Sequence, residues 1–125
     1  MVSINESLAI SEKRLEDRVA ARVTVQLFQE NRVLLTEYSV NLSVGGIFLE
    51  AEKLLAEWTR LVLHFELPDS RHIHCQARVA WVNNPQSLLC QDLPPGMGIQ
   101  FIDLQPEDME SLREFVKKKL ILAAW

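Results

Sequence analysis

Apolar and polar residues alternate along most of this chain, and a period of two residues is the pattern of a half-buried β-strand. In residues 23–28 every second residue is Val or Leu, and Glu30-Asn31 form a predicted turn before a second strand over residues 33–40. We predict further strands over residues 47–49, 60–67, 72–82 and 97–104, separated by Gly45-Gly46, by Pro68-Asp69-Ser70 and by a proline-containing loop over 83–95. In the strand over 72–82, the residues expected on one face are Ile73, Cys75, Ala77, Val79 and Trp81.

The pattern changes near the end of the chain, where a helix is predicted over about residues 106–122. Pro106 suits the first helical position, and Glu107 and Asp108 suit the positive end of a helix dipole. Apolar residues then recur three and four positions apart, at Met109, Leu112, Phe115, Val116 and Leu120. Short antiparallel strands followed by one helix predict a mainly β fold, a small barrel of about six strands with the helix packed on it.

Length and composition indicate one globular domain of 125 residues with a net charge of −4. An acidic chain is a poor binder of nucleic-acid polymers, which need a broad basic surface. The two cysteines form no disulfide framework, and we find neither a secretory signal nor a run long enough to enter a membrane, so we expect a cytoplasmic protein. Residues 1–13 are polar and predicted to be flexible, and the domain is expected over residues 14–125.

Two groups of polar residues interrupt the apolar pattern. Arg14, Arg18 and Arg22 follow one another at four-residue steps, and the sequence Asn41-Leu42-Ser43-Val44-Gly45-Gly46 lies within a strand-like passage. Guanidinium groups match phosphates and the acceptor edge of guanine two atoms at a time. On an extended segment Asn41 and Ser43 point the same way, so together they are suited to a guanine edge.

Each of these residues also has a purely structural interpretation. The arginines are close in sequence to acidic residues with which they can pair on a solvated surface. Asn41 and Ser43 can form turns that bond their own backbone. Gly46 is explained by a positive φ, by a close approach of the backbone to a ligand, or by turn formation alone.

The combination of these motifs resembles the PilZ family of bacterial cyclic di-GMP receptors, whose signature is Arg-x-x-x-Arg followed downstream by Asp/Asn-x-Ser-x-x-Gly. The two halves read Arg18-Val19-Ala20-Ala21-Arg22 and Asn41-Leu42-Ser43-Val44-Gly45-Gly46, and the similarity extends over about residues 14–118. The resemblance implies a β-barrel with a C-terminal helix and cyclic di-GMP as ligand, without a further cofactor. The ligand-binding residues that it implies are Arg14, Arg18, Arg22, Asn41, Ser43, Gly45 and Gly46.

The arginine pair can be aligned with the signature in two registers. Arg14 and Arg18 have the same spacing as Arg18 and Arg22. We take Arg18 and Arg22 as the pair, because Arg22 resembles the family's arginine that enters the first strand. Arg14 is then either an extra contact, for example to a second stacked ligand, or a bystander charge. Asn41 stands where many family members carry aspartate, and an amide gives up a charge-assisted hydrogen bond.

The resemblance implies a sensor and adaptor rather than an enzyme, and we find no nucleophile, phosphate loop or paired carboxylates. In this hypothesis the segment 14–22 folds over cyclic di-GMP and the altered surface engages an unidentified protein effector. The alternative is a PilZ-fold adaptor that binds no nucleotide and acts through protein contacts, for example through its apolar tail, 120–125. His64, His72 and His74 fit a solvated strand face better than a metal site, and the sequence leaves the oligomeric state open.

Overall fold

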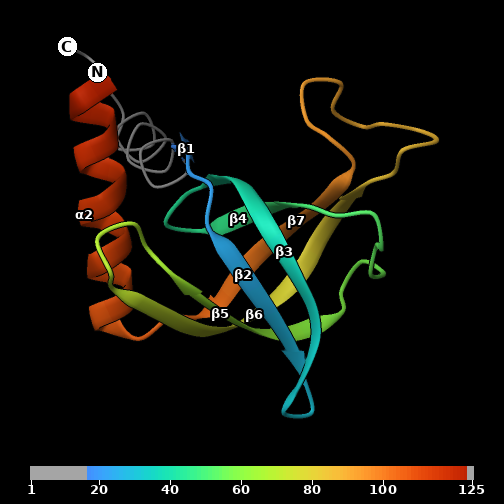
Figure 1. Cartoon of the computed structure of the whole chain (residues 1–125), viewed down its shortest axis with the longest axis horizontal. Coiled ribbons are helices and arrows are strands. Elements are labelled where there is room, and N and C mark those ends of the chain that lie inside the picture. Colours follow the sequence, from blue (N-terminus) through green and yellow to red (C-terminus); the bar gives the residue numbers. More distant parts are fainter. Residues whose placement is uncertain (1–16, 124–125) are drawn as a thin grey trace, which may run out of the picture.

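A computed structural model describes residues 17–123 of the chain. Within that range seven strands are followed by one helix (Figure 1). The elements are β1 (Val19–Ala20), β2 (Thr24–Gln29), β3 (Arg32–Leu42), β4 (Gly46–Glu50), β5 (Arg60–Glu66), β6 (His72–Asn83), β7 (Gly96–Asp103) and α2 (Pro106–Ala123). The mainly β fold with a C-terminal helix that the sequence predicts is confirmed.

The strands form a closed antiparallel barrel. Their order is β1-β3-β2-β5-β6-β7-β4, and an additional pairing of β3 with β4 closes the ring of six strands. β1, which the sequence analysis did not predict, adds to the outside of this ring by pairing with the end of β3. Glu30 and Asn31 both have positive φ angles, 52° and 62°, so the predicted turn between β2 and β3 is present and twists with its strands.

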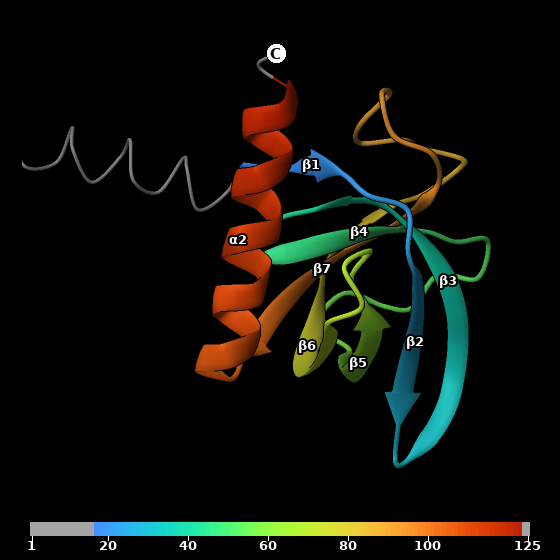
Figure 2. The same ribbon diagram turned by 60° about the vertical axis from the view of Figure 1, so that its left-hand side comes forward.

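The alternating residues fill the barrel, and one side of α2 covers it. Val25, Leu27, Leu63 and Ile73 have no exposed surface, as their alternation predicts. In α2 the buried residues are Leu112, Phe115 and Val116. Leu120 was expected on the same apolar stripe, but 41% of its surface is exposed. Ile121 and Leu122 are exposed as well, because the last turns of α2 extend past the barrel wall (Figure 2).

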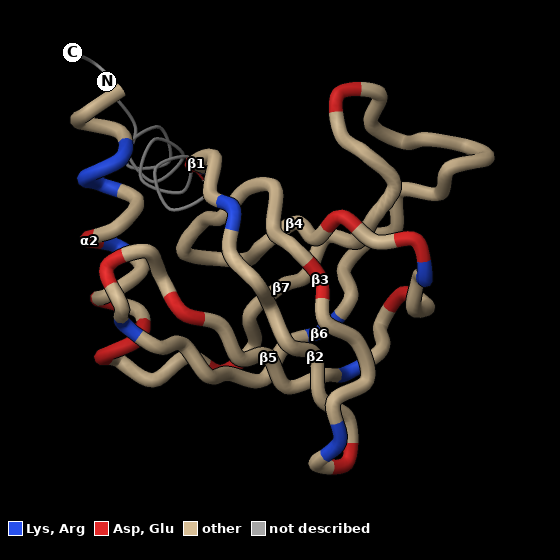
Figure 3. The backbone as a smooth tube through the Cα atoms, viewed as in Figure 1, with Lys and Arg blue, Asp and Glu red and all other residues tan. Residues whose placement is uncertain are grey.

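An ion-pair network joins Glu114 of α2 to the turn between β5 and β6. Arg71, directly before β6, lies 2.6 Å from Asp69 and 2.7 Å from Glu114 of α2. The basic residues of α2 lie mainly in its second half, and Figure 3 shows them on the same side of the molecule as the start of β2. Within residues 17–123 no helix is both long and apolar enough to cross a membrane.

One sequence prediction about β6 is wrong, and the error concerns the functional site. The pairing of β6 with β7 shifts between Val79 and Trp81, so the alternation of faces is interrupted there. Ile73, Cys75 and Val79 face the core, as expected, whereas Trp81 is only half-buried and lies outside it. The irregularity turns the indole toward a surface cavity.

Candidate functional site

Arg18 is positioned by the short strand that follows it. Val19 is buried and pairs with Leu42, and Ala20 pairs with Asn41, so β1 fixes the chain beside the end of β3. From there Nη1 of Arg18 donates a hydrogen bond of 3.0 Å to Oδ1 of Asn41. The two halves of the sequence motif are therefore in contact.

The residues after β3 form a compact turn, which we call the 43–46 turn. The backbone N–H of Ser43 donates to the carbonyl of Gly46 at 2.8 Å, and the Ser43 hydroxyl accepts the N–H groups of Gly45 and Gly46 at 3.2 and 3.1 Å. The Ser43 hydroxyl lies 3.3 Å from the Gly46 carbonyl, to which it donates. Ser43 is thus buried and bonded within its own turn, as its structural interpretation predicts.

The two glycines of the turn have different roles. Neither has a positive φ, so the positive-φ explanation of Gly46 is wrong. A Cβ at Gly46 would lie 2.3 Å from the carbonyl oxygen of Ile99 on β7, which no side chain tolerates. A Cβ at Gly45 would meet nothing closer than 3.9 Å. Gly46 is required by the close approach of β7, whereas Gly45 is exposed.

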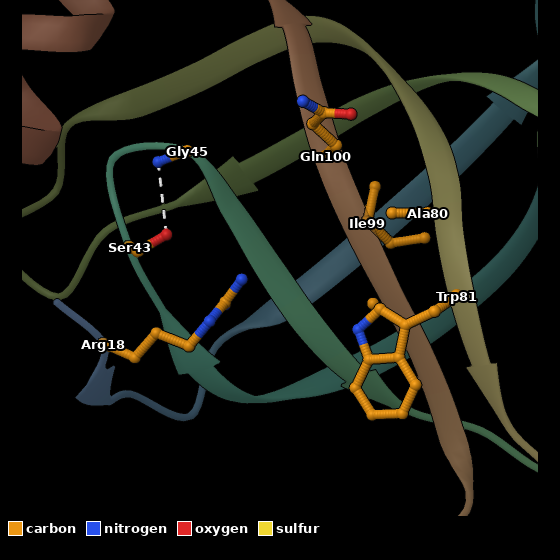
Figure 4. Close-up of a pocket in the computed structure, with 8 residues that line it drawn as sticks. Arg18, Ser43, Gly45, Ala80, Trp81, Ile99 and Gln100 are labelled. Carbon is orange, nitrogen blue, oxygen red and sulfur yellow. Dashed lines mark hydrogen bonds between the residues drawn. The ribbon is translucent and has the colours of Figure 1, made fainter. Parts of the chain in front are cut away.

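A cavity of about 490 Å³ lies between this turn and the β6–β7 pair. Arg18, Ser43 and Gly45 line one side, and the residues on the other side are Ala80, Trp81, Gly98, Ile99 and Gln100 (Figure 4). The Trp81 indole packs on Gly98, where a Cβ would lie 2.0 Å from Nε1, and its ring centroid is 5.3 Å from that of Phe48. The absence of a side chain at Gly98 is what lets the indole lie against β7.

This arrangement combines a cation with a flat aromatic wall. The guanidinium of Arg18 can bind an anion through two parallel N–H groups. The indole of Trp81 offers a surface on which a planar base can stack. The cavity is therefore suited to a ligand that carries both a phosphate and a base.

Arg22 is not brought to this cavity. Its guanidinium lies 4.5 Å from the centre of the Tyr38 ring and 3.7 Å from the carboxylate of Glu50. It lines a different hollow, together with Ala20, Ala21, Phe115 and Lys119. Of the predicted ligand-binding residues, Arg18, Ser43 and Gly45 line the cavity, and Asn41 contacts Arg18. Arg14 lies outside the described residues.

The three histidines do gather on the outer face of β5 and β6. The ring of His64 lies 5.5 Å from that of His72 and 5.9 Å from that of His74. In the described range, however, no group of three or more His, Cys, Asp or Glu side chains is arranged to hold a metal ion.

Two residues of the cavity, Trp81 and Gln100, were missed as site residues by the sequence analysis. The alternation in β6 predicts Trp81 on the same face as Ile73 and Val79, because the irregularity that breaks this alternation depends on the pairing of β6 with β7. The signal that was available is a glycine, Gly98, in the strand that pairs with it.

Comparisons with known proteins add a family and a fold. The family model that describes the PilZ domain matches residues 12–118. The structure of the inhibitor of motility MotI/DgrA from Bacillus subtilis is similar with a TM-score of 0.68 and 23% identity, over 83% of this chain and 49% of that one. This chain thus spans about half the length of that protein structure.

Two PilZ domain structures are also similar. The PilZ domain of YcgR from Escherichia coli, determined with c-di-GMP, has a TM-score of 0.63 at 17% identity and covers 86% of this chain and 91% of that one. The PilZ domain of CeSA from a cellulose-synthesizing bacterium has a TM-score of 0.55 at 20% identity, over 82% of this chain and 96% of that one. No match is found among curated proteins.

Proposed function

Because the chain belongs to the PilZ domain family, we propose that it is a receptor for cyclic di-GMP that passes the signal to a protein effector. PilZ domain proteins are a family of c-di-GMP-binding adaptors rather than enzymes. The ligand is assigned to the cavity between Arg18 and Trp81.

The observation that carries this proposal is the meeting of separate motif residues at one cavity. Arg18 directly precedes β1, the 43–46 turn follows β3, and Trp81 comes from β6. Cyclic di-GMP has two phosphates and two guanines, so it can use a guanidinium and an aromatic wall at the same time. The Asn41 amide, next to Arg18, supplies a hydrogen-bonding group for the guanine edge.

The position of Arg22 favours the register in which Arg14 and Arg18 form the arginine pair. Arg22 is engaged with Tyr38 and Glu50, away from the cavity. If Arg22 bound the ligand instead, it would lose its contacts with Tyr38 and Glu50. We therefore assign the phosphates to Arg14 and Arg18 and a structural role to Arg22.

The signal is proposed to leave through α2. β1 contacts α2, and Ala20 and Ala21 share a hollow with Phe115 and Lys119 of the helix. When the arginine segment orders over the ligand, β1 is held more firmly against that helix. The exposed Leu120, Ile121 and Leu122 at its end offer the effector an apolar surface.

The test is a calorimetric titration of cyclic di-GMP into the wild-type chain and the variants Arg18→Ala and Arg113→Ala. Arg113 is an exposed arginine on α2 and serves as the matched control for loss of one positive charge. Micromolar or tighter binding that is lost only in Arg18→Ala supports the proposal. A folded wild-type chain that gives no binding heat and no thermal stabilisation with the ligand rejects it.

One observation supports the alternative, a PilZ-fold adaptor that binds no nucleotide. The hydrogen bond from Arg18 to Asn41 already pairs two groups that the ligand would need. In this second function β1 stays fixed, and protein contacts through the end of α2 act alone. Loss of effector binding on Leu122→Glu, with no effect of Arg18→Ala, would distinguish it.

A further inference from the structure

Arg78 and Gln100 form a pair on the outer face of the barrel, at the edge of the cavity. They lie opposite each other in the β6–β7 ladder, and Nε of Arg78 donates a hydrogen bond of 2.9 Å to Oε1 of Gln100. Gln100 is exposed and lines the cavity, whereas Arg78 is half-buried behind it. Gln100 is also paired with Gly46 of β4, so its backbone is fixed on both sides.

This hydrogen bond fixes the orientation of the Gln100 amide. The Nε of an arginine can only donate, so the atom that it contacts must be the amide oxygen. The amide nitrogen, with its two donors, then points away from Arg78. In Figure 4 this nitrogen of Gln100 lies on the side of the amide that is nearer to Gly45. Gln100 lines the cavity, so its amide donors are available to a ligand there.

Arg78 is itself held in place by a loop that has a strained backbone. Its guanidinium lies 4.7 Å from the centre of the Trp58 ring, a cation–π contact. Trp58 has a φ of 73°, which is unusual for a large residue, and its N–H donates to the carbonyl of Val79 at 2.8 Å. The N–H of Val79 in turn donates to the carbonyl of Thr59 at 2.9 Å. A backbone outlier of this kind persists where the surrounding structure fixes it. The Trp58 ring fixed in this way contacts the guanidinium of Arg78.

We propose that Gln100 reads the base that stacks on Trp81, and that Arg78 is the positioning residue that keeps the Gln100 donors toward that base. The inference rests on the proposed function and adds to it a determinant of base specificity. Guanine presents two acceptors, O6 and N7, on the edge where adenine presents one acceptor and an amino donor. The N–H groups of Gln100, held in place by Arg78, can donate to the two acceptors of guanine. With adenine, one of these donors would face the amino group, which is also a donor.

The experiment compares the dissociation constants of cyclic di-GMP and cyclic di-AMP for the wild-type chain and for Arg78→Met, Arg78→Lys and Gln100→Glu. In Arg78→Met the amide is free to turn its oxygen toward the base, so the preference for cyclic di-GMP should fall roughly tenfold. Arg78→Lys keeps a group that only donates, and should retain most of the preference. Arg113→Met is the control for loss of an exposed arginine elsewhere.

Gln100→Glu provides a test that does not depend on removing Arg78. The carboxylate keeps its contact with the Arg78 guanidinium but has no N–H donors, so affinity for cyclic di-GMP should fall roughly tenfold. An unchanged ratio in Arg78→Met, or unchanged affinity in Gln100→Glu, overturns the inference while cyclic di-GMP still binds the wild-type chain. If the wild-type chain binds neither dinucleotide, the proposed function fails first.

Discussion

Arg18 donates a hydrogen bond of 3.0 Å to the side chain of Asn41, 23 residues further along the chain. This contact joins the arginine half of the motif to its polar half and sets Arg18 at the rim of the cavity. Arg22 lines a different hollow and packs on Tyr38 instead.

The arginines are predicted to differ in their effect on ligand affinity. Removing a charged hydrogen-bonding group costs about 1.5–3 kcal/mol, so Arg18→Ala and Arg14→Ala should each raise the dissociation constant of cyclic di-GMP about 10- to 150-fold. Arg22→Ala should raise it only a few-fold. Calorimetry on the three variants gives the comparison, with thermal unfolding as the check of the fold. Equal losses in Arg22→Ala and Arg18→Ala would restore the register that the sequence favoured.

Trp81 is predicted to contribute to binding through its ring. Stacking of a base on an aromatic side chain is worth about 1–3 kcal/mol, so Trp81→Leu should weaken binding about 5- to 150-fold, while Trp81→Phe keeps most of the affinity. The same titration measures both variants. A leucine variant that is folded and binds as tightly as the phenylalanine variant would show that the base stacks elsewhere.

Substitutions at the two glycines of the 43–46 turn are predicted to differ in their effect on the stability of the fold. Gly46→Ala forces a methyl group against the Ile99 carbonyl and should lower the free energy of unfolding by about 1–3 kcal/mol. Gly45→Ala has room for its methyl group and should change that free energy by less than about 0.5 kcal/mol. Urea denaturation of the two variants provides the test. The assignment is wrong if Gly45→Ala is the less stable of the two.

The two cysteines are predicted to react at very different rates. Burial, followed by the charges of Asp108 and Asp103, raises the pKa of the Cys75 thiol to about 12, and only 4% of the residue is exposed. At pH 8 iodoacetamide should therefore label Cys90, which is partly exposed, and leave Cys75 unlabelled until urea is added. Peptide mapping by mass spectrometry separates the two sites. Labelling of Cys75 at a similar rate in the folded chain would contradict its position in the core.

Glu37 is predicted to reduce stability at neutral pH. Burial, and then the neighbouring Glu52 and Glu50, raise the pKa of its carboxyl above 4.5 in the folded chain. The folded state then favours the protonated form, so the cost of ionised Glu37 is present above the folded pKa and disappears below 4.5. Glu37→Gln should be more stable at pH 7 by about 0.2–1 kcal/mol, the size of a like-charge contact across strands.

The measurement for Glu37 is urea denaturation at several pH values. The advantage of Glu37→Gln over wild type should shrink as the pH falls toward 4. Glu57→Gln, at an exposed position in the loop after β4, is the matched control. A difference between Glu37→Gln and wild type that is the same at pH 4 and pH 7 would show that the effect is not electrostatic.

Much of the fold follows from local patterns in the sequence. The alternation in residues 23–28 and the turn at Glu30-Asn31 depend on nearest neighbours, and the structure has both. β1 is two residues long and forms because Asn41 and Leu42 lie beside it, so no local sequence pattern could predict it. The course of β6 past Val79 likewise depends on its partner strand, which is why Trp81 was assigned to the wrong face.

The candidate site was predictable only in part, for the same reason. The motif identified Arg18 and the 43–46 turn, and the structure brings them to one cavity. The choice of Arg22 as the second arginine of the pair rested on its place at the start of a predicted strand, whereas its contacts with Tyr38 and Glu50 depend on residues far along the chain. Gln100 belongs to a strand that the sequence predicts, but its proximity to Arg18 is a long-range property of the closed barrel.

β1 is short, and in the proposed function its length bears on the apparent affinity of the chain for cyclic di-GMP. Arg18 stands next to a strand with two paired residues and a contact with α2, and the residues that follow this strand are hydrogen-bonded to Ser39 and Val40 of β3. If the ligand binds only when β1 is paired, its apparent affinity scales with the fraction of molecules in which this short strand is closed. In the proposed function, residues of α2 that touch β1 would then tune the concentration of cyclic di-GMP at which the chain responds, without contacting the ligand.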